Sequence, residues 1–264
     1  IPGSPIAYWV TNSFLKAFED FDSFESVGFP KVGMQTADNK KFLRRWMELH
    51  KKSLVKGSGW VPYLKGGGFR RWYGNFEYLL DFRNDGAELR ATKNATTQDL
   101  AVLTRMKYTW NSVSSRNFCC RVGAEYAFHD IGGHCFYPKQ QDADFLLGFL
   151  NTKVFQQFIS TINPTINYQV GDVGSVPLAK AETGSSTTVG SIVMEIVGLC
   201  RDDWNHSELS WDFLCSPLLR KTGSIDEDYQ DLLKSSRDAF FRLHNDEEEL
   251  NRIFIEIYGL QDEL

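Results

Sequence analysis

Apolar residues recur at intervals of three and four positions in several stretches of the chain, and this spacing predicts amphipathic helices. The widest stripe runs from 144 to 162, where we expect one helix. The same spacing predicts further helices at 40–52, 189–204, 226–243 and 246–258. Short apolar runs beside turn residues predict strands at 78–82, 108–110 and 118–122, and a strand pair formed by 127–131 and 135–138.

These elements predict an α/β (α+β) fold over residues 31–180, with a twisted, mostly antiparallel sheet, flanking helices and the 144–162 helix packed across it. A small polar stretch at 182–188 predicts a linker, and a helical segment occupies 181–264. Residues 1–30 form a lead-in. The first residue is not methionine and the sequence stops within a helical pattern, so we expect a piece of a longer protein.

Composition places the chain among ordinary water-soluble globular proteins, with 42% hydrophobic and 24% charged residues. No apolar run approaches the length of a membrane span, and the first residues do not resemble a signal peptide, so no membrane contact is expected. Five cysteines, two of them adjacent at Cys119 and Cys120, do not suit a disulfide framework. A reducing, cytoplasmic compartment is therefore expected.

Charge is distributed very unevenly along the chain. The formal net charge is −5, yet residues 40–73 contain ten Lys or Arg and one acid. Residues 104–121 add four basic residues and no acid, whereas 201–264 contain seven basic and sixteen acidic residues. This asymmetry predicts a basic binding face joined to an acidic helical segment, although part of the basic charge around 40–56 could simply be the solvated side of a helix.

The stretch Gly66–Asn75 is the strongest candidate for a binding loop. Three glycines allow backbone conformations with φ > 0 and close approach to another molecule. Arginine forks match phosphate oxygens and the guanine edge, and flat rings stack on bases or sugars. The alternative is a glycine-rich hairpin whose Trp72 and Tyr73 pack against the sheet.

Other chemistry is weakly supported. His129, His134 and Cys135 are zinc-ligand types, but their spacing matches no strong metal pattern. A nuclease would need clustered carboxylates, and Asp81, Asp85 and Glu88 are the nearest approach to such a cluster. Turn chemistry and surface exposure account for these three acids equally well, so a metal-dependent nuclease is the weaker alternative.

Several segments resemble a known family. The run Gly33–Asn39, with Phe42, is similar to the G-x-x-T-G-x-N motif that opens the target-recognition domain of TaqI-like and type IIG adenine-specific DNA methyltransferases. Residues 66–78 are similar to the G-G-x-F-R-[KR]-W-Y-G-N-x-E-Y signature of the PglX methyltransferases of BREX phage-defence systems. Later stretches also resemble this region, in the same order: 136–139, 146–154, 163–172 and 249–260. One departure is Ala37, which replaces the usual glycine.

The resemblance implies sequence-specific recognition of double-stranded DNA for an adenine-N6 methyltransferase, in restriction-modification or BREX-type defence. It implies a fold like that of type I and IIG specificity domains, preceded by a methyltransferase domain of the same polypeptide. No cofactor-binding glycine motif and no N-P-P-[YF] loop occur in the chain. We therefore expect no cofactor and no catalytic residue here, with S-adenosylmethionine bound by the longer parent; other defence-system subunits are further candidate partners.

Roles follow from the resemblance and from residue chemistry. The basic loop and the 104–121 segment would lie in or along the major groove. The residues expected to contact DNA are Lys40, Arg44, Lys65, Arg70, Arg71, Trp72, Tyr73, Asn75, Arg116 and Arg121. The residues expected to build the motif turn are Gln35, Thr36, Asp38 and Asn39. The main alternative function is a protein-interaction module whose acidic helices dock partner subunits.

Overall fold

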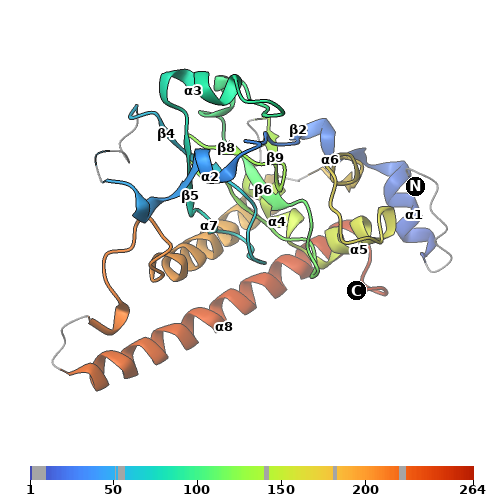
Figure 1. The fold of residues 1–264 in the computed structure, drawn as a ribbon. Coiled ribbons are helices and arrows are strands. Elements are labelled where there is room, and N and C mark those ends of the chain that lie inside the picture. The colour runs from blue at the N-terminus through green and yellow to red at the C-terminus, as the bar shows by residue number, and fades with distance from the viewer. Residues whose placement is uncertain (2–9, 51, 53–56, 140–142, 181–182, 220–223) are drawn as a thin grey trace.

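In the part of the chain that the structure describes, two four-stranded sheets, a layer of helices and one long C-terminal helix make up the fold (Figure 1). The computed structural model describes residues 1, 10–50, 52, 57–139, 143–180, 183–219 and 224–264. A two-stranded ribbon, β1 (Asp22–Ser23) with β10 (Pro177–Leu178), joins the start of the chain to its later part. The mixed α/β fold expected from the sequence is confirmed.

The first sheet is antiparallel throughout and has the strand order β2-β9-β6-β7. Its strands are β2 (Gly28–Lys31), β9 (Gly133–Pro138), β6 (Tyr108–Asn111) and β7 (Cys120–Val122). Because side chains alternate across a strand, one face of the sheet carries Tyr108, Trp110 and Phe136 into the largest buried cluster, against the helices. The opposite face carries Cys135 and Tyr137 into a smaller cluster with Leu64 of the second sheet.

The second sheet has the order β3-β5-β4-β8, with β8 parallel to β4 and the other pairs antiparallel. Its strands are β3 (Leu43–Arg45), β5 (Tyr78–Asp81), β4 (Trp60–Leu64) and β8 (Phe128–His129). A separate buried cluster around Phe42, Leu80 and Phe128 stabilises this sheet.

Helices cover the first sheet and connect the strands. The α-helices are α1 (Asn12–Asp20), α2 (Asn39–Phe42), α3 (Arg83–Arg90), α4 (Ala143–Leu150), α5 (Lys153–Ile162), α6 (Val170–Gly174), α7 (Thr183–Asn205) and α8 (Ile225–Tyr258). Short 3₁₀ turns are η1 (Phe24–Val27), η2 (Trp46–Glu48), η4 (Leu100–Val102) and η5 (Pro217–Leu219).

The largest buried cluster combines residues from both ends of the chain and from its middle. It contains Phe14 from α1, Trp110 from β6, Phe149 from α4, Ile196 from α7 and Phe254 from α8. The lead-in, the first sheet and the C-terminal helices therefore share one core, whereas the second sheet has its own.

The helix expected at 40–52 is wrong. The chain forms α2, then strand β3, then η2, and residue 51 lies outside the described part. Leu43 pairs with Leu80 in the sheet, so tertiary pairing overrides the helical spacing. Trp46 is only partly buried, and its Nε1 donates to the Leu209 carbonyl at 3.1 Å.

The single helix expected at 144–162 is two helices, α4 and α5, separated at Asn151 and Thr152. The Asn151 side chain bonds both the N–H and the C=O of Cys120, each at 3.0 Å, which ties this break to strand β7. Thr152 then caps α5 by accepting a hydrogen bond from the Phe155 N–H at 3.2 Å.

The strand pair expected from 127–131 and 135–138 is also wrong. Strand β8 pairs with β4, whereas β9 pairs with β2 and β6, so the two strands belong to different sheets. The turn between them crosses from one sheet to the other. A Cβ on Gly133 would lie within 3 Å of backbone atoms of Leu64 and Gly66, so the chain can pass this closely only with glycine at this position.

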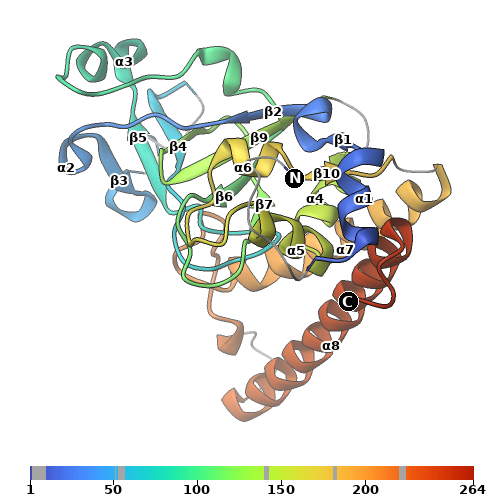
Figure 2. The same ribbon diagram turned by 90° about the vertical axis from the view of Figure 1, so that its right-hand side faces the viewer.

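The two helices expected at 226–243 and 246–258 are one continuous helix, α8, of 34 residues. The linker expected at 182–188 is helical from Thr183 onward, as part of α7, and residue 182 lies outside the described ranges. The N-terminal half of α8 extends beyond the rest of the protein in both views (Figure 1, Figure 2).

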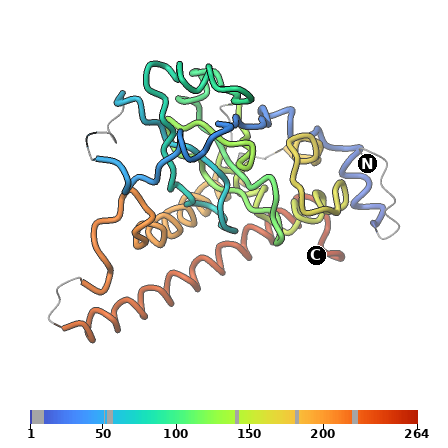
Figure 3. Tube along the Cα trace, in the orientation of Figure 1, coloured from blue at the N-terminus to red at the C-terminus, as the bar shows by residue number. Residues whose placement is uncertain are grey.

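The start of α1 lies beside the last residues of the chain (Figure 3). Thr11 Oγ1 donates to the carboxylate of Glu263, and Thr11 also caps α1. Across the described ranges, the helices are all too short or too polar to cross a bilayer. All five cysteines are free thiols.

Candidate nucleic-acid interface

The loop Gly66–Asn75 leaves the end of β4 and runs along the edge of the first sheet. The Trp72 N–H donates to the Cys120 carbonyl at 2.8 Å, and the Trp72 carbonyl accepts from the Val122 N–H at 3.0 Å. The indole is buried, with 2% of its residue surface exposed. Trp72 therefore anchors the loop and is not available to contact DNA in this structure.

Acidic side chains of the C-terminal helices hold the middle of this loop. Arg70 pairs with Asp203 of α7, and its guanidinium lies over the Trp204 ring, 5.0 Å from the ring centre. Glu247 of α8 accepts from the Trp72 Nε1 at 2.7 Å and pairs with Arg71 at 3.2 Å. We call these contacts the loop–helix clasp. In the clasp, two acidic side chains of the 201–264 segment pair with Arg70 and Arg71, and both arginines are only partly exposed.

The end of the loop is also supported from within. Tyr73 is half-buried; its ring contacts Phe76, with centres 5.0 Å apart, and carries the Arg201 guanidinium 5.1 Å above it. Burial raises the pKa of the Tyr73 hydroxyl above its ordinary value. Asn75 donates from Nδ2 to the Gly68 carbonyl at 2.9 Å.

Arg121 is buried between the loop and the first sheet, with 1% of its surface exposed. Its Nη2 donates to the Gly66 carbonyl at 2.8 Å and to Asn111 Oδ1 at 3.1 Å. Burial lowers the pKa of this guanidinium. Arg121 thus holds the loop through the Gly66 carbonyl. Because its side chain is buried, it cannot make the expected phosphate contact in this structure.

An open groove lies where the glycines meet the loop after β6. Its volume is about 460 Å³, and its lining residues are Gly67, Gly68, Phe69, Asn111, Val113, Ser114, Ser115 and Arg116. The Phe69 ring has the Arg116 guanidinium 5.6 Å and the Arg71 guanidinium 5.9 Å from its centre. Arg116 is exposed, as are both lining glycines. This groove therefore brings a ring, a cation and accessible backbone to one surface.

The motif turn is built as a structural unit. Gln35 exchanges hydrogen bonds with Thr96 and donates from Nε2 to the Asn94 carbonyl at 2.6 Å. Thr36 is buried and donates to Asn39 Oδ1 at 2.6 Å. Asp38 caps α2 through the Lys41 N–H at 3.0 Å. These polar groups hold the turn, which carries Lys40 and Lys41 on its exposed side.

The remaining expected cations differ in exposure. Lys40 is exposed, whereas Arg44 folds back so that its Nη1 donates to the carbonyls of Lys40 at 2.6 Å and Leu43 at 2.7 Å. Lys65 lies 3.3 Å from Asp130, and 30% of its side chain is exposed. Asp130 also accepts from the Tyr63 hydroxyl at 2.9 Å. Lys40 and Arg116 are therefore the expected contacts with the most accessible charge.

Two of the three carboxylates weighed for a nuclease are paired with cations. Arg83 donates to Asp81 at 2.8 Å, and these hydrogen bonds lower the pKa of Asp81. Glu88 pairs with Lys41 at 2.7 Å, and Asp85 lies in a left-handed turn with φ 54°. Nowhere in the described ranges do three or more His, Cys, Asp or Glu side chains form a group that could hold a metal.

The histidines and cysteine considered for zinc are buried in the sheets. Burial lowers the pKa of His129 to about 3 and raises the pKa of Cys135 to about 12. His129 Nδ1 contacts the Gly133 carbonyl at 3.1 Å. These shifts favour neutral side chains that contribute to packing.

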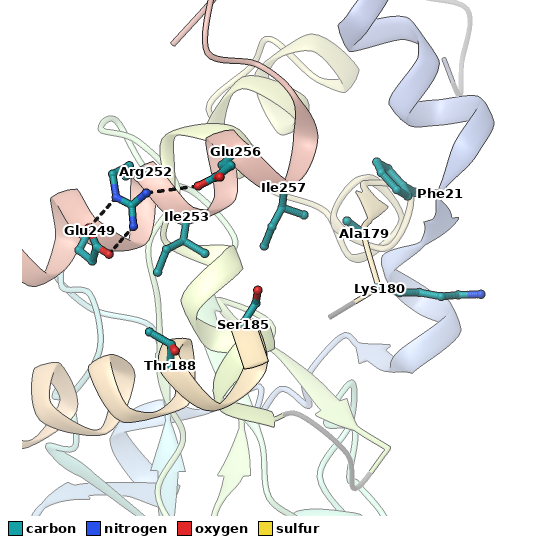
Figure 4. A pocket seen from close by; sticks show the side chains of 10 residues that line it. All are labelled: Phe21, Ala179, Lys180, Ser185, Thr188, Glu249, Arg252, Ile253, Glu256 and Ile257. Carbon is teal, nitrogen blue, oxygen red and sulfur yellow. Dashed lines mark hydrogen bonds and ion pairs between the residues drawn. The ribbon is translucent and has the colours of Figure 1, made fainter. Parts of the chain in front are cut away.

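A second groove, of about 570 Å³, lies between α7 and the C-terminal half of α8 (Figure 4). Glu249 and Glu256 on its rim both pair with Arg252, at 2.7 and 3.2 Å. Lys180 points away from the other lining side chains (Figure 4). Glu249, Arg252 and Glu256 are thus directed at one another, and Lys180 pairs with Asp22, outside the lining, at 3.7 Å. The lining residues offer no convergent set of polar groups.

Residues outside the expected set of contacts also shape the site. Phe69 lies within the glycine loop, so the motif itself could have indicated that its ring contributes to the site. Asn111, Asp203 and Glu247 are distant in sequence from the loop, and only the folded chain shows that they contact it.

Comparison with known proteins extends these observations. No protein-family model matches the chain. The whole chain is 32% identical to the adenine-specific methyltransferase PglX of Lacticaseibacillus casei (strain Zhang) and 32% identical to the adenine-specific methyltransferase BrxX of Escherichia coli O9:H4 (strain HS). It spans only 24% and 22% of these relatives. The resemblance to PglX methyltransferases is thereby confirmed for a segment about a quarter of their length.

The fold is also similar to part of a solved structure, the Type IIL restriction-modification enzyme MmeI in complex with DNA. The TM-score is 0.57, and the match covers 89% of this chain and 33% of MmeI. Sequence identity is 11%, so this likeness concerns the fold alone.

Proposed function

We propose that this chain, which over its full length is similar to a segment of the PglX and BrxX adenine-specific methyltransferases, recognises double-stranded DNA for such an enzyme. The fold shared with MmeI, a protein solved in complex with DNA, supports this proposal. The relevant setting would be BREX-type or restriction-modification defence in the cytoplasm. Methyl transfer and S-adenosylmethionine would belong to the rest of the polypeptide, which is the expected partner of this segment.

The observation that carries the proposal is the open groove at Phe69 and Arg116. Its aromatic ring, exposed guanidinium and exposed glycine backbone suit contact with sugar, base and phosphate. A guanidinium can neutralise phosphate or bind a guanine edge, and both contacts occur at duplex surfaces. An open groove also suits a duplex better than an enclosed small molecule, which is usually largely buried.

The residues expected to contact DNA fall into two groups, according to how accessible their side chains are in the structure. We assign phosphate contacts to Arg116, Lys40 and Lys65. Arg70, Arg71, Tyr73 and Asn75 would act at the rim of the loop, where the clasp holds them in place.

The proposal predicts salt-dependent binding that requires Arg116. We would measure fluorescence anisotropy with a duplex of about 30 base pairs while raising salt from about 50 to about 200 mM. Arg116→Ala should weaken binding and reduce the slope of log K against log salt by about 1, because one phosphate contact is lost. Arg237→Ala, on the exposed half of α8, is the matched control and should leave the slope unchanged. Absence of binding at the lowest salt would contradict the proposal.

A second candidate, a protein-interaction module, is favoured by one observation. The projecting half of α8 exposes Ile225, Tyr229, Leu233 and Phe240, and these side chains lie on the same helical face as the buried Leu250 and Phe254. Exposed apolar stripes of this kind mark contact surfaces. Partner binding through this stripe would be insensitive to salt, whereas DNA binding would fall steeply with it.

A further inference from the structure

All three glycine carbonyls of the loop accept hydrogen bonds from side chains of the protein. The Gly66 carbonyl accepts from Arg121 Nη2 at 2.8 Å, and the Gly67 carbonyl accepts from Asn111 Nδ2 at 2.8 Å. The Gly68 carbonyl accepts from Asn75 Nδ2 at 2.9 Å. Arg121 and Asn111 are both buried, whereas the hydrogen bond from Asn75 lies at the surface. Together the three hydrogen bonds orient three consecutive peptide groups.

That orientation determines where the next three N–H groups point. In a planar trans peptide the N–H is directed opposite to the preceding C=O, and the chain contains no cis bond among its described residues. The N–H groups of Gly67 and Gly68 are therefore directed away from the buried Arg121 and Asn111 side chains, and the Phe69 N–H is directed away from the Asn75 amide. No backbone acceptor is found for them in the described ranges. A Cβ built on Gly68 meets no atom within 4 Å, and both Gly67 and Gly68 are exposed, so the space beside these two glycines is open.

A second, independent observation concerns the charge beneath the loop. Arg121 is 1% exposed, and its Nε and Nη1 have no hydrogen-bond partner within the described ranges. The neighbouring groups that influence its charge are three cysteine thiols and another cation, Arg70. Buried charges are normally paired, because an unpaired one is costly to bury. The uncompensated positive charge directly below Gly66 favours an anion at the loop.

An exposed cation completes the arrangement on the outer side. Arg116 borders the same groove as Gly67, Gly68 and Phe69, and its guanidinium sits by the Phe69 ring. Successive backbone N–H groups without protein acceptors, beside a positive charge, are a common phosphate-binding arrangement in proteins. The groove, at about 460 Å³, has room for a phosphate group.

We propose that the N–H groups of Gly67, Gly68 and Phe69, together with Arg116, form a binding site for one phosphate group, with the charge of Arg121 beneath it. The source of the phosphate is the backbone of duplex DNA, and this part of the inference rests on the proposed function. The site would fix the position of the duplex on the protein, so that the neighbouring side chains meet the bases in a constant register.

Two glycine substitutions form a matched pair for the test. Gly67 has φ +110°, and a Cβ there would lie 2.9 Å from the Asn75 side chain. Gly67→Ala should therefore displace Asn75, release the Gly68 carbonyl and weaken duplex binding by about 10-fold, the value of one charge-assisted hydrogen bond. Gly171→Ala, in α6 and outside the groove, adds a methyl group that meets no atom within 4 Å, so the affinity of this control should stay close to that of the unsubstituted chain.

The measurement is a ¹⁵N NMR titration of the whole chain, first with inorganic phosphate and then with the duplex. We expect both ligands to shift the amide signals of Gly67, Gly68 and Phe69, and Arg116→Ala to diminish those shifts. If Gly67→Ala does not fold, as judged by its amide spectrum, the Arg116→Ala titration carries the test.

The outcomes separate the two proposals. Duplex binding without shifts at the three amides would overturn the phosphate site and leave the DNA-recognition proposal standing. Shifts with inorganic phosphate but no duplex binding would support the phosphate site and overturn its assignment to DNA. Shifts with neither ligand would overturn the site.

Discussion

Ala37 shows how a single residue can keep a motif's shape at a cost in stability. The motif usually has glycine at this position, and a left-handed conformation is unfavourable for alanine. Ala37 nonetheless adopts φ 59°. The hydrogen bonds of Gln35, Thr36 and Asp38 on either side hold the turn in this conformation.

Replacing Ala37 with glycine should therefore stabilise the protein. Ala37→Gly removes the Cβ from a left-handed residue, and we expect the free energy of unfolding to rise by about 0.5–1 kcal/mol. Urea denaturation measures this change. Ala91, exposed with φ −80°, is the control: Ala91→Gly should destabilise, because it only adds entropy to the unfolded chain. A lower free energy of unfolding for Ala37→Gly would contradict the strain argument.

At the scale of elements, the division between α4 and α5 depends on one capping residue. The apolar spacing of 144–162 continues through the break, so the pattern by itself favours one helix. Asn151 bonds strand β7 instead of continuing the helix, and Thr152, 4% exposed, begins α5. Its hydroxyl also donates to the Phe149 carbonyl at 2.7 Å, which satisfies an end group of α4.

Thr152→Ala should lower the free energy of unfolding by about 1–2 kcal/mol, because it removes the cap of one helix and a donor to the other. Thr152→Ser keeps the hydroxyl and should retain most of the stability. Thermal and urea unfolding of both variants would test this. Equal losses in the two variants would assign the effect to the lost methyl group and not to the cap.

At the scale of the whole molecule, the acidic helices and the basic loop interact with each other. Charge counting separates them into a binding face and an acidic segment, yet Asp203 and Glu247 bring the two together in the loop–helix clasp. Glu247 is the central residue because it accepts from a buried indole and pairs with Arg71. The clasp therefore couples the groove at Phe69 to the position of α8.

Removing the Glu247 carboxylate should destabilise the protein and loosen the loop. Glu247→Ala leaves the buried Trp72 N–H without its acceptor, and we expect a loss of about 1–3 kcal/mol in the free energy of unfolding. Glu248→Ala is the matched control, since its ion pair with Lys153 is exposed and should be worth under about 1 kcal/mol. Hydrogen exchange at the loop amides should accelerate only in Glu247→Ala. Unchanged exchange there would contradict the coupling.

The sequence alone determined much of the local organisation. The strands at 78–82, 108–110 and 118–122 are present, and the turn at Asn84, Asp85 and Gly86 has positive φ at all three residues. The family resemblance was also visible from motifs, because each motif is a short run whose residues are read directly. These features depend on interactions between neighbours, which the chain encodes locally.

Only the tertiary structure decided which of the expected binding residues face solvent. Arg121 and Trp72 are residue types that often contact DNA, yet both side chains are buried. Arg116 and Phe69, in contrast, border the open groove. Likewise β8 and β9 entered different sheets, and β3 replaced part of a helix. Burial and pairing depend on partners distant in sequence, such as Glu247 for Trp72 and Leu80 for Leu43, and no local pattern specifies those partners.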